Sequence, residues 1–317
     1  MTVASPYAVE LARLPVTTRT LALAGSSTHV WEYGAAGADE AARADADTVL
    51  IVVHGFRGDH HGLEPVIAQL GDPASEAARG RRIVAPDLPG FGDSGPLAGD
   101  HDVDGYVAWL RELVDRVRRE SPNARLVVVG HSFGSIVSSA ALAGGLEVDD
   151  AVLINPISAP ALKGPKGVMT RLAIGYYWFS AAVPEKLGFA LLRSALVVRI
   201  VSITMSRTKD RHLLRWIHDQ HSRYFSAFAS RSVVLDAFRG SVSHDVSEYA
   251  AQVTVPTLLI AADDDDITPL AAQHEVQRAM PDARLVVLEN VGHLIHYERP
   301  VEAAAAIEAF LAEERPA

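Results

Sequence analysis

Residues 125–144 read RLVVVGHSFGSIVSSAALAG, and this stretch decides the fold. An apolar run comes first, Gly130–Gly134 then fits the pattern G-x-S-x-G, and a row of small residues follows. This order predicts a buried strand, a sharp turn and a helix. The glycines allow a turn too tight for a Cβ, which exposes the hydroxyl of Ser132 in front of the positive end of the helix. The stretch therefore favours a serine nucleophile over a chance serine in a glycine-rich turn.

Further apolar runs bounded by glycine or proline lie on both sides of this stretch and predict buried parallel strands. These runs are Thr48–His54, Arg82–Ala85, Ala151–Ile154, Pro256–Ala261 and Arg284–Leu288. Helical periods between them, as in Val107–Val117, indicate βαβ units and a parallel sheet. An Ala-rich helix is expected over Val301–Leu311. Thr18–Ala24 and His29–Tyr33, separated by a turn at Gly25-Ser26-Ser27, predict an antiparallel hairpin at the sheet edge.

The segment from 158 to 247 interrupts this pattern. It contains no sheet-type run, it holds most of the aromatic residues, and its apolar spacing is helical. We expect an inserted helical cap over 158–247, broken at Pro184 and Gly188, between two parts of a core domain at 1–157 and 248–317. The aromatic residues either roof an apolar pocket or pack the cap onto the sheet.

Composition excludes several classes of protein. The 317 residues carry a net charge of −10 and are 49% hydrophobic, which excludes collagen-like, coiled-coil and wholly disordered chains and disfavours nucleic-acid binding. The absence of cysteine excludes disulfides, thiolate nucleophiles and Cys-ligated metals.

Nothing in the sequence predicts export or a membrane anchor. The N-terminus lacks the basic and apolar regions of a signal peptide. The apolar stretches near 172–184 and 195–205 are interrupted or flanked by Arg171, Glu185 and Arg199, and fall short of the ~18 residues of a spanning helix. We expect a soluble cytoplasmic protein without an integral membrane segment, as a monomer or homodimer.

Candidate partners for Ser132 follow the last two predicted strands. Four aspartates, Asp263–Asp266, follow one strand, and Val291-Gly292-His293 follows the other. Open α/β sheets place functional groups at these strand ends. A serine nucleophile needs a base, and the base needs an acid that orients it, so the chain order Ser, Asp, His is informative. His296 lies close by, but the Gly-His order favours His293 as the base.

Taken together, these motifs resemble the α/β-hydrolase superfamily, and within it the capped branch of serine esterases and C–C bond hydrolases. The resemblance extends from about Thr18 to Leu311. It rests on four motifs: His54-Gly55-Phe56, Asp87–Ser94, Gly130–Gly134, and Asp265–Pro269 with Gly292-His293. It implies an α/β-hydrolase fold, with a mostly parallel eight-stranded sheet flanked by helices and an inserted helical cap.

The resemblance also implies roles for individual residues. Ser132 is the expected nucleophile and His293 the base, and the backbone N–H groups of Phe56 and Phe133 form the oxyanion hole. Asp265 falls on the acid of the family pattern, with Ile267 and Pro269 in place and Ala262 where glycine is usual. Asp263, Asp264 and Asp266 are then solvated loop charges, because a calcium loop would need a glycine and a distal glutamate. Asn155 stands where some relatives carry the acid.

Weaker signals concern substrate and metal binding. We expect substrate contacts from His54, Gly55, Arg57, His131, Trp178 and Leu294. His54 more plausibly orders its loop, and Arg57 either pairs with a substrate carboxylate or is structural. His60 and His61 are adjacent, and adjacent residues rarely chelate one ion, so no metal is expected. His218 and His221 are expected to be solvated or to pack the cap, and Asp87 and Asp93 to be structural.

The resulting prediction is a serine hydrolase that needs no cofactor. Its substrate is expected to be the carboxylic ester of a small apolar or aromatic molecule, and a monoester with a free carboxylate is one candidate. The same residues serve C–C bond hydrolases, lactonases and amidases, so these activities stay open. A non-catalytic ligand-binding homologue is a further alternative from a different class. The only partner expected is the small-molecule ester, and no nucleic acid.

Overall fold

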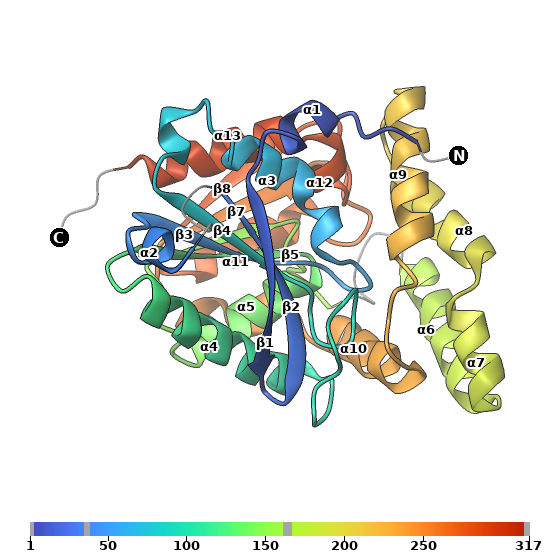
Figure 1. The fold of residues 1–317 in the computed structure, drawn as a ribbon. Helices are drawn as coiled ribbons and strands as arrows, with labels where there is room; N and C mark the ends of the chain where they lie inside the picture. Colours follow the sequence, from blue (N-terminus) through green and yellow to red (C-terminus); the bar gives the residue numbers. More distant parts are fainter. Residues whose placement is uncertain (1–2, 35–38, 161–166, 314–317) are drawn as a thin grey trace.

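The computed structural model describes residues 3–34, 39–160 and 167–313. Its centre is one eight-stranded sheet with the order β1-β2-β4-β3-β5-β6-β7-β8 (Figure 1). The strands are β1 (Val16–Leu23), β2 (Ser26–Tyr33), β3 (Thr48–Val53), β4 (Arg81–Pro86), β5 (Arg125–His131), β6 (Asp150–Ile154), β7 (Thr257–Ala262) and β8 (Ala283–Leu288). The β1–β2 and β2–β4 pairs are antiparallel, and all other neighbours are parallel. The predicted fold class is confirmed.

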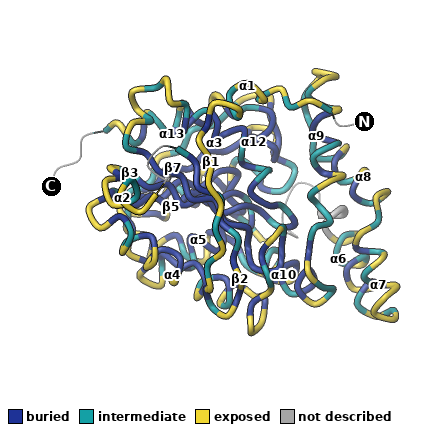
Figure 2. The backbone as a smooth tube through the Cα atoms, viewed as in Figure 1, coloured by how far each residue is buried: buried dark blue, intermediate teal, exposed yellow. Residues whose placement is uncertain are grey.

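The parallel strands are apolar throughout because helices cover both faces of the sheet. Along β3, Val49 and Ile51 belong to one hydrophobic cluster, while Leu50 and Val52 belong to the other. The first cluster includes residues of α4 (Val103–Glu120) and α5 (Phe133–Ala143), and the second includes residues of α3 (Glu64–Leu70) and α13 (Pro300–Leu311). The sheet is therefore the middle of three layers, and Figure 2 shows it as the most buried part of the chain.

Several short elements complete the core. They are α1 (Ala8–Leu11), α2 (Glu40–Ala44), α11 (Leu270–Ala279), α12 (Ile295–Glu298) and the 3-10 turns His60–Gly62, Glu76–Ala78, Val246–Glu248 and Ala250–Gln252. The turn of the N-terminal hairpin is one residue earlier than predicted. Ala24 and Gly25 both adopt positive φ, 47° and 75°, so β2 already begins at Ser26. A two-residue hairpin turn requires this conformation at both central residues.

In the part of the chain that the structure describes, five α-helices lie between β6 and β7: α6 (Gly167–Ala182), α7 (Glu185–Leu192), α8 (Ala195–Met205), α9 (Arg211–Tyr224) and α10 (Arg231–Ser243). We call them the helical segment; within its described residues no strand is present. Figure 1 shows α6 to α9 beside the sheet, on one side of the molecule.

One expected break in the helical segment is wrong. Pro184 does separate α6 from α7, but Gly188 lies inside α7. A Cβ at Gly188 would collide with the carbonyl oxygen of Ser180 in α6. The glycine therefore allows α7 to pack closely against α6, and the next break falls at Arg193 and Ser194.

Candidate active site

Ser132 forms the whole turn between β5 and α5. Its φ of 52° and ψ of −117° lie outside the regions that L residues ordinarily adopt. A Cβ at Gly134 would collide with the carbonyl oxygen of Val53 in β3, and a Cβ at Gly130 would come within 2.6 Å of the carbonyl oxygen of Gly134. The two glycines thus allow the close approach of β3, β5 and α5 that holds the strained serine in place.

The structure brings Ser132, His293 and Asp265 together. Nε2 of His293 lies 2.8 Å from Oγ of Ser132, and its Nδ1 lies 2.8 Å from Oδ2 of Asp265. Asp265 follows β7 and His293 follows β8, so neighbouring strands deliver the two side chains to the end of β5. In this order of contacts, an imidazole can take the proton of a serine hydroxyl while a carboxylate holds the ring.

Asp265 is buried but has enough donors to remain ionised. Burial alone would raise the pKa of the carboxyl group. The charge of His293 and hydrogen bonds from His293 and the N–H groups of Ile267 and Thr268 outweigh it, so the pKa of Asp265 is lowered below its ordinary value. The carboxylate can therefore stabilise an imidazolium ion at neutral pH.

Asn155 completes the surroundings of Asp265, a role that the sequence pattern did not predict. Its Nδ2 donates to Oδ2 of Asp265 at 3.1 Å and to the carbonyl oxygen of Gly292 at 3.3 Å. Asn155 also adopts a positive φ of 45° at the end of β6. The sequence does show a polar residue directly after a buried strand, which marks a candidate site residue. It does not show what Asn155 donates to, because both acceptors lie in distant loops, after β7 and after β8.

Asp264 and Asp266 are expected from the sequence to be solvated charges, but the structure pairs both with an arginine. Arg207, which follows α8, donates from Nε to Asp264 at 2.8 Å and from Nη2 to Asp266. The N–H of Arg207 donates to Glu298 at 2.7 Å. Since Arg207 directly follows α8, these contacts fasten the end of α8 to the loop that carries Asp265 and to α12.

The two backbone N–H groups expected to face an oxyanion are available. Phe133 is the first residue of α5, where a helix offers its N–H no acceptor. Across the described ranges, neither this N–H nor that of Phe56 has a protein acceptor. A Cβ at Gly55 would lie 3.1 Å from the Cβ of Ser132, so this glycine lets the loop pass close to the serine. Two such donors could stabilise a tetrahedral oxyanion.

His54 has its ring held by the loop rather than by a ligand. Its Nε2 accepts the N–H of Leu88 at 2.8 Å, and its Nδ1 donates to the carbonyl oxygen of Gly55 at 2.8 Å. Both ring nitrogens are therefore used in fixing the loop before Phe56. The side chain still lines a cavity beside Ser132.

Two cavities of different character meet at Ser132 and His293. One, of about 300 Å³, is mostly apolar and lies between the sheet and α8. The other, of about 60 Å³, is lined by four further histidines: His54, His131, His221 and His296. Gly55 and Leu294 also line the small cavity, so four of the six expected substrate contacts border it. We call the two spaces the large cavity and the small cavity.

Three histidines of the small cavity, His131, His221 and His296, are held neutral by burial. Burial lowers the pKa of His131 and of His221 to about 3, and it lowers that of His296 well below its ordinary value. Among the described residues, Nε2 of His131 and Nδ1 of His296 have no hydrogen-bond partner. The small cavity thus combines neutral imidazole rings with the carboxylate of Asp59, which also lines it.

Two of the six expected substrate contacts lie away from both cavities. Trp178 is 71% exposed and borders neither cavity. Arg57 is only 4% exposed, also borders neither cavity, and its guanidinium is occupied. It donates to the carbonyl oxygens of Phe225 and Leu192 at 3.0 and 2.7 Å and to the hydroxyl of Tyr177 at 3.1 Å. Arg57 therefore links the core loop to α6, α7 and α9, and a substrate carboxylate loses its expected partner.

Replacing Arg57 by alanine is expected to lower the free energy of unfolding by about 3–5 kcal/mol, because it leaves two carbonyl groups and a hydroxyl unpaired. Urea unfolding of wild type, Arg57→Ala and Arg57→Lys would measure this loss, and lysine should restore part of it. If Arg57→Ala were as stable as wild type and raised KM only for substrates that bear a carboxylate, Arg57 would be a substrate-binding residue.

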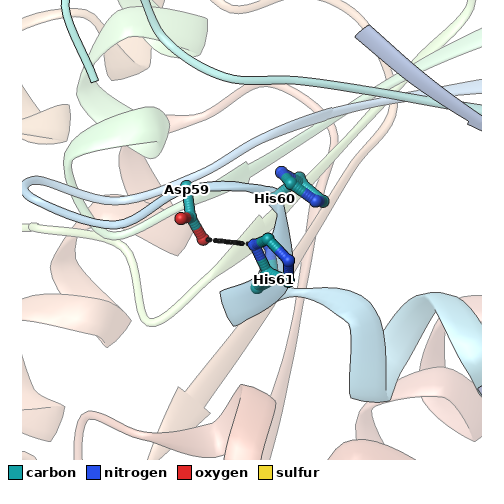
Figure 3. A group of neighbouring side chains, drawn as sticks. All are labelled: Asp59, His60 and His61. Atoms are coloured by element: carbon teal, nitrogen blue, oxygen red, sulfur yellow. Dashed lines mark hydrogen bonds and ion pairs between the residues drawn. The ribbon is translucent and has the colours of Figure 1, made fainter. Parts of the chain in front are cut away.

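One group of side chains has the proximity that a metal site needs. Ligand atoms of Asp59, His60 and His61 lie within 4.8 Å of one another (Figure 3). However, Nδ1 of His61 is paired with Asp59 at 3.3 Å, and Nδ1 of His60 with Asp87 at 2.9 Å.

Ring stacking further constrains both histidines. His60 stacks on Trp31, and His61 stacks on Tyr224 of α9. Burial lowers the pKa of His60 to about 2, so its neutral ring donates to Asp87. These contacts explain why Asp59, His60 and His61 lie close together: they pack the core against α9. That no metal is bound there stays a prediction.

Comparison with known proteins identifies similar chains. The model of the alpha/beta hydrolase family matches residues 50–307. Lipase 1 from Psychrobacter immobilis is 24% identical over 270 residues, which are 82% of this chain and 76% of the lipase.

Solved structures agree in fold. The enol-lactonase from Burkholderia xenovorans LB400 has a TM-score of 0.70 at 18% identity and covers 93% of this chain and 100% of its own. An esterase from Exiguobacterium antarcticum has a TM-score of 0.69 at 15% identity and covers 91% of this chain and 97% of its own.

Proposed function

This chain belongs to the alpha/beta hydrolase family, and we propose that within it the protein is a serine esterase for amphipathic esters. Such an ester has one bulky apolar part and one small polar part. The observation that carries the proposal is the meeting of the two cavities at Ser132 and His293. An ester carbonyl at Ser132 would have space for a long apolar group on one side and only for a small polar group on the other.

The proposed reaction starts with attack of Oγ of Ser132 on the acyl carbon. Nε2 of His293 takes the hydroxyl proton, and Asp265 holds the ring and stabilises the imidazolium ion. The oxyanion accepts hydrogen bonds from the N–H groups of Phe56 and Phe133. One such donor is worth about 10²–10³ in kcat in other enzymes.

Collapse of this intermediate breaks the bond to the leaving alkoxide, which takes the proton from His293. Water then attacks the acyl-enzyme, with His293 as the base, and releases the acid and Ser132. This sequence of steps requires no cofactor. The neutral rings of His131 and His296 line the small cavity and suit an uncharged polar group of the substrate, such as a hydroxyl, better than a charged one.

Two matched ester series test the proposal. Glycerol monoesters of acids from two to twelve carbons have a small polar alcohol, and acetates of alcohols of the same lengths have a small acyl group. We expect rapid hydrolysis in one series, with kcat/KM rising with chain length until the large cavity is filled. Esters bulky on both sides should react more slowly. Equal rates for all esters would contradict the assigned shape of the substrate.

If no ester is hydrolysed, labelling with a fluorophosphonate shows whether the wrong esters were chosen or the protein has no reactive serine. We expect the adduct on the peptide that contains Ser132, found by mass spectrometry. Labelling without ester turnover would direct the search to amides, lactones or C–C bonds. A protein that is neither labelled nor active would be a ligand-binding homologue, and the enzyme proposal would fail.

A further inference from the structure

We propose that the outer face of α6 and α8 docks onto an anionic lipid bilayer, from which the substrate enters the large cavity. The face consists of Leu172, Trp178 and Phe179 on α6 and Leu196, Ile200 and Ile203 on α8, and we call it the apolar face. All six side chains are exposed, by between 49% and 71%. This inference rests on the proposed function for the nature of the substrate, but not for the docking itself.

The exposed residues recur with the spacing of a helix surface. Leu196, Ile200 and Ile203 are four and three residues apart, and Leu172 and Phe179 are seven apart, so each of these two sets forms one stripe. Trp178 lies about 100° around α6 from Phe179, at the edge of the second stripe. Figure 1 places α6, α7 and α8 together at one edge of the molecule, and Figure 2 shows exposed stretches there. Water-exposed apolar side chains gathered on neighbouring helices mark an interaction site more often than chance scatter.

The inner side of α8 is fixed to the protein, which leaves its outer side free to meet a partner. Val198 is buried, and the hydroxyl of Ser202 lies 2.6 Å from Nδ1 of His218 and 2.8 Å from Nδ1 of His221 on α9. His218 and His221, which the sequence left as either solvated or packing residues, are both buried and pack α9 against α8.

Charge identifies the partner as an anionic surface. Between Gly167 and Tyr224 there are nine Lys and Arg and only three Asp and Glu, so this part carries +6 although the whole chain carries −10. Arg171, Lys186 and Arg199 are exposed beside or within the apolar stripes. Apolar residues flanked by basic ones are typical of helices that lie in the interface of anionic membranes.

The same region approaches the composition of a membrane span without forming one. Glu185–Met205 has a window of mean hydropathy 1.8, which is long and apolar enough to cross a membrane by length and composition. Core helices of globular proteins pass the same test, but only 22% of this window is buried. The chain breaks between α7 and α8, and a broken backbone facing lipid would be costly inside the bilayer. We therefore infer that α8 lies on the membrane and does not cross it.

One residue connects the apolar face with the proposed chemistry. Ile200 is 49% exposed on the outer side and also lines the large cavity, together with Val201, Thr204 and Met205 of the same helix. A lipophilic chain leaving the bilayer along α8 would therefore reach the cavity beside Ser132 without crossing water. This path favours an ester dissolved in the membrane over one free in solution.

Vesicle binding of the full chain tests the docking. Flotation with phosphatidylcholine vesicles, with and without 30% phosphatidylglycerol, measures binding, and the fluorescence of Trp178 reports insertion. The chain has four tryptophans; Trp109 and Trp216 are buried, whereas Trp178 is 71% exposed. We expect binding to the anionic vesicles, weakened by salt, with a blue shift that is absent from Trp178→Phe.

Two multiple variants measure how much the apolar and the basic side chains contribute to vesicle binding. Trp178→Gln/Leu196→Gln/Ile203→Gln and Lys186→Glu/Arg199→Glu should each weaken binding by about tenfold or more. Matched controls change exposed residues elsewhere: Val9→Gln/Val16→Gln/Val301→Gln and Arg79→Glu/Arg278→Glu. These should bind as wild type does, and circular dichroism would verify that every variant is folded.

Three results would overturn the docking proposal: no binding to anionic vesicles, binding that the controls reduce as much as the variants do, or a dimer in ultracentrifugation that Trp178→Gln/Leu196→Gln/Ile203→Gln dissociates. The last would assign the apolar face to a second copy of the chain. Failure of docking with Ser132 labelled and esters hydrolysed leaves the proposed function intact. Docking without labelling or turnover removes the proposed function alone.

Discussion

Replacing Ser132 by alanine is expected to lower kcat for the best ester by about 10⁵–10⁶-fold, the largest effect of any single substitution in this chain. The loss is large because attack, proton transfer and the acyl-enzyme all require this hydroxyl. The N–H groups of Phe56 and Phe133 would still polarise a bound carbonyl, so a small rate above that of water should remain. Initial rates at saturating substrate, with the fluorophosphonate adduct as a second readout, measure the loss.

Stability provides the control for Ser132→Ala. Alanine has the same backbone restriction as serine at φ of 52°, so the strained turn persists in the variant. The free energy of unfolding should change by less than about 1 kcal/mol. A variant that retains activity above contaminant levels would place the nucleophile elsewhere. A variant that loses activity together with its fold would leave the nucleophile to be judged by labelling of the wild type alone.

Sequence periodicity predicted the sheet well because its central strands, β3 to β7, are buried on both faces. Continuous apolar runs such as 125–130 have few other places in a folded chain, and the observed parallel strands differ from the predicted ones by at most one residue at either end. In the antiparallel hairpin the agreement is poorer, since β2 begins three residues before the predicted His29. The elbow was predictable for a similar reason. The close approaches at Gly130 and Gly134 tolerate only glycine, so the geometry is visible in the residue types themselves.

The partners of polar side chains were less predictable. The place of Arg57 after the oxyanion loop suggests a partner for a substrate carboxylate. Its hydrogen-bond acceptors instead lie between 120 and 168 residues further along the chain. Arg207 meets two aspartates 57 and 59 residues away, in a loop whose charges had been taken as solvated. Such contacts depend on how the helical segment sits on the core, which local patterns do not encode.

Helix surfaces posed a different difficulty. The aromatic residues of the helical segment were expected either to line a pocket or to pack, and the structure divides them. Tyr177 stacks on Phe238 at 3.7 Å between ring centroids, whereas its neighbour Trp178 faces outward. Residues one apart point in directions about 100° apart on a helix, so a rich local composition cannot say which side chain is turned inward.

Replacing Asp265 by asparagine is expected to lower kcat by about 10⁴-fold, because it reverses the hydrogen bond to the imidazole. Oδ1 of Asp265 accepts the N–H of Ile267 at 2.8 Å, so the amide oxygen of the variant would take that position. The amide NH₂ would then face Nδ1 of His293 and donate to it. The proton of the ring would move to Nε2, which could no longer accept a proton from Ser132.

The position of Asn155 gives this prediction a matched rescue. In wild type its Nδ2 donates to the same Oδ2 of Asp265 that pairs with His293. Combining Asp265→Asn with Asn155→Asp exchanges donor and acceptor between the two positions, so the new carboxylate accepts from the amide and restores a negative charge near His293. We expect kcat to recover by about tenfold or more over Asp265→Asn, whereas Asn155→Asp alone places two carboxylates in contact and should lower activity.

Steady-state rates of the four proteins in this cycle provide the measurement, with urea unfolding as the control for folding. Wild-type activity in Asp265→Asn would show that the carboxylate does not orient the base. Activity of the double variant no higher than that of Asp265→Asn would mean that position 155 lies too far from Nδ1 of His293 to act as its acid. Recovery would instead tie the base to a carboxylate near Nδ1, whichever of the two strand ends, β6 or β7, supplies it.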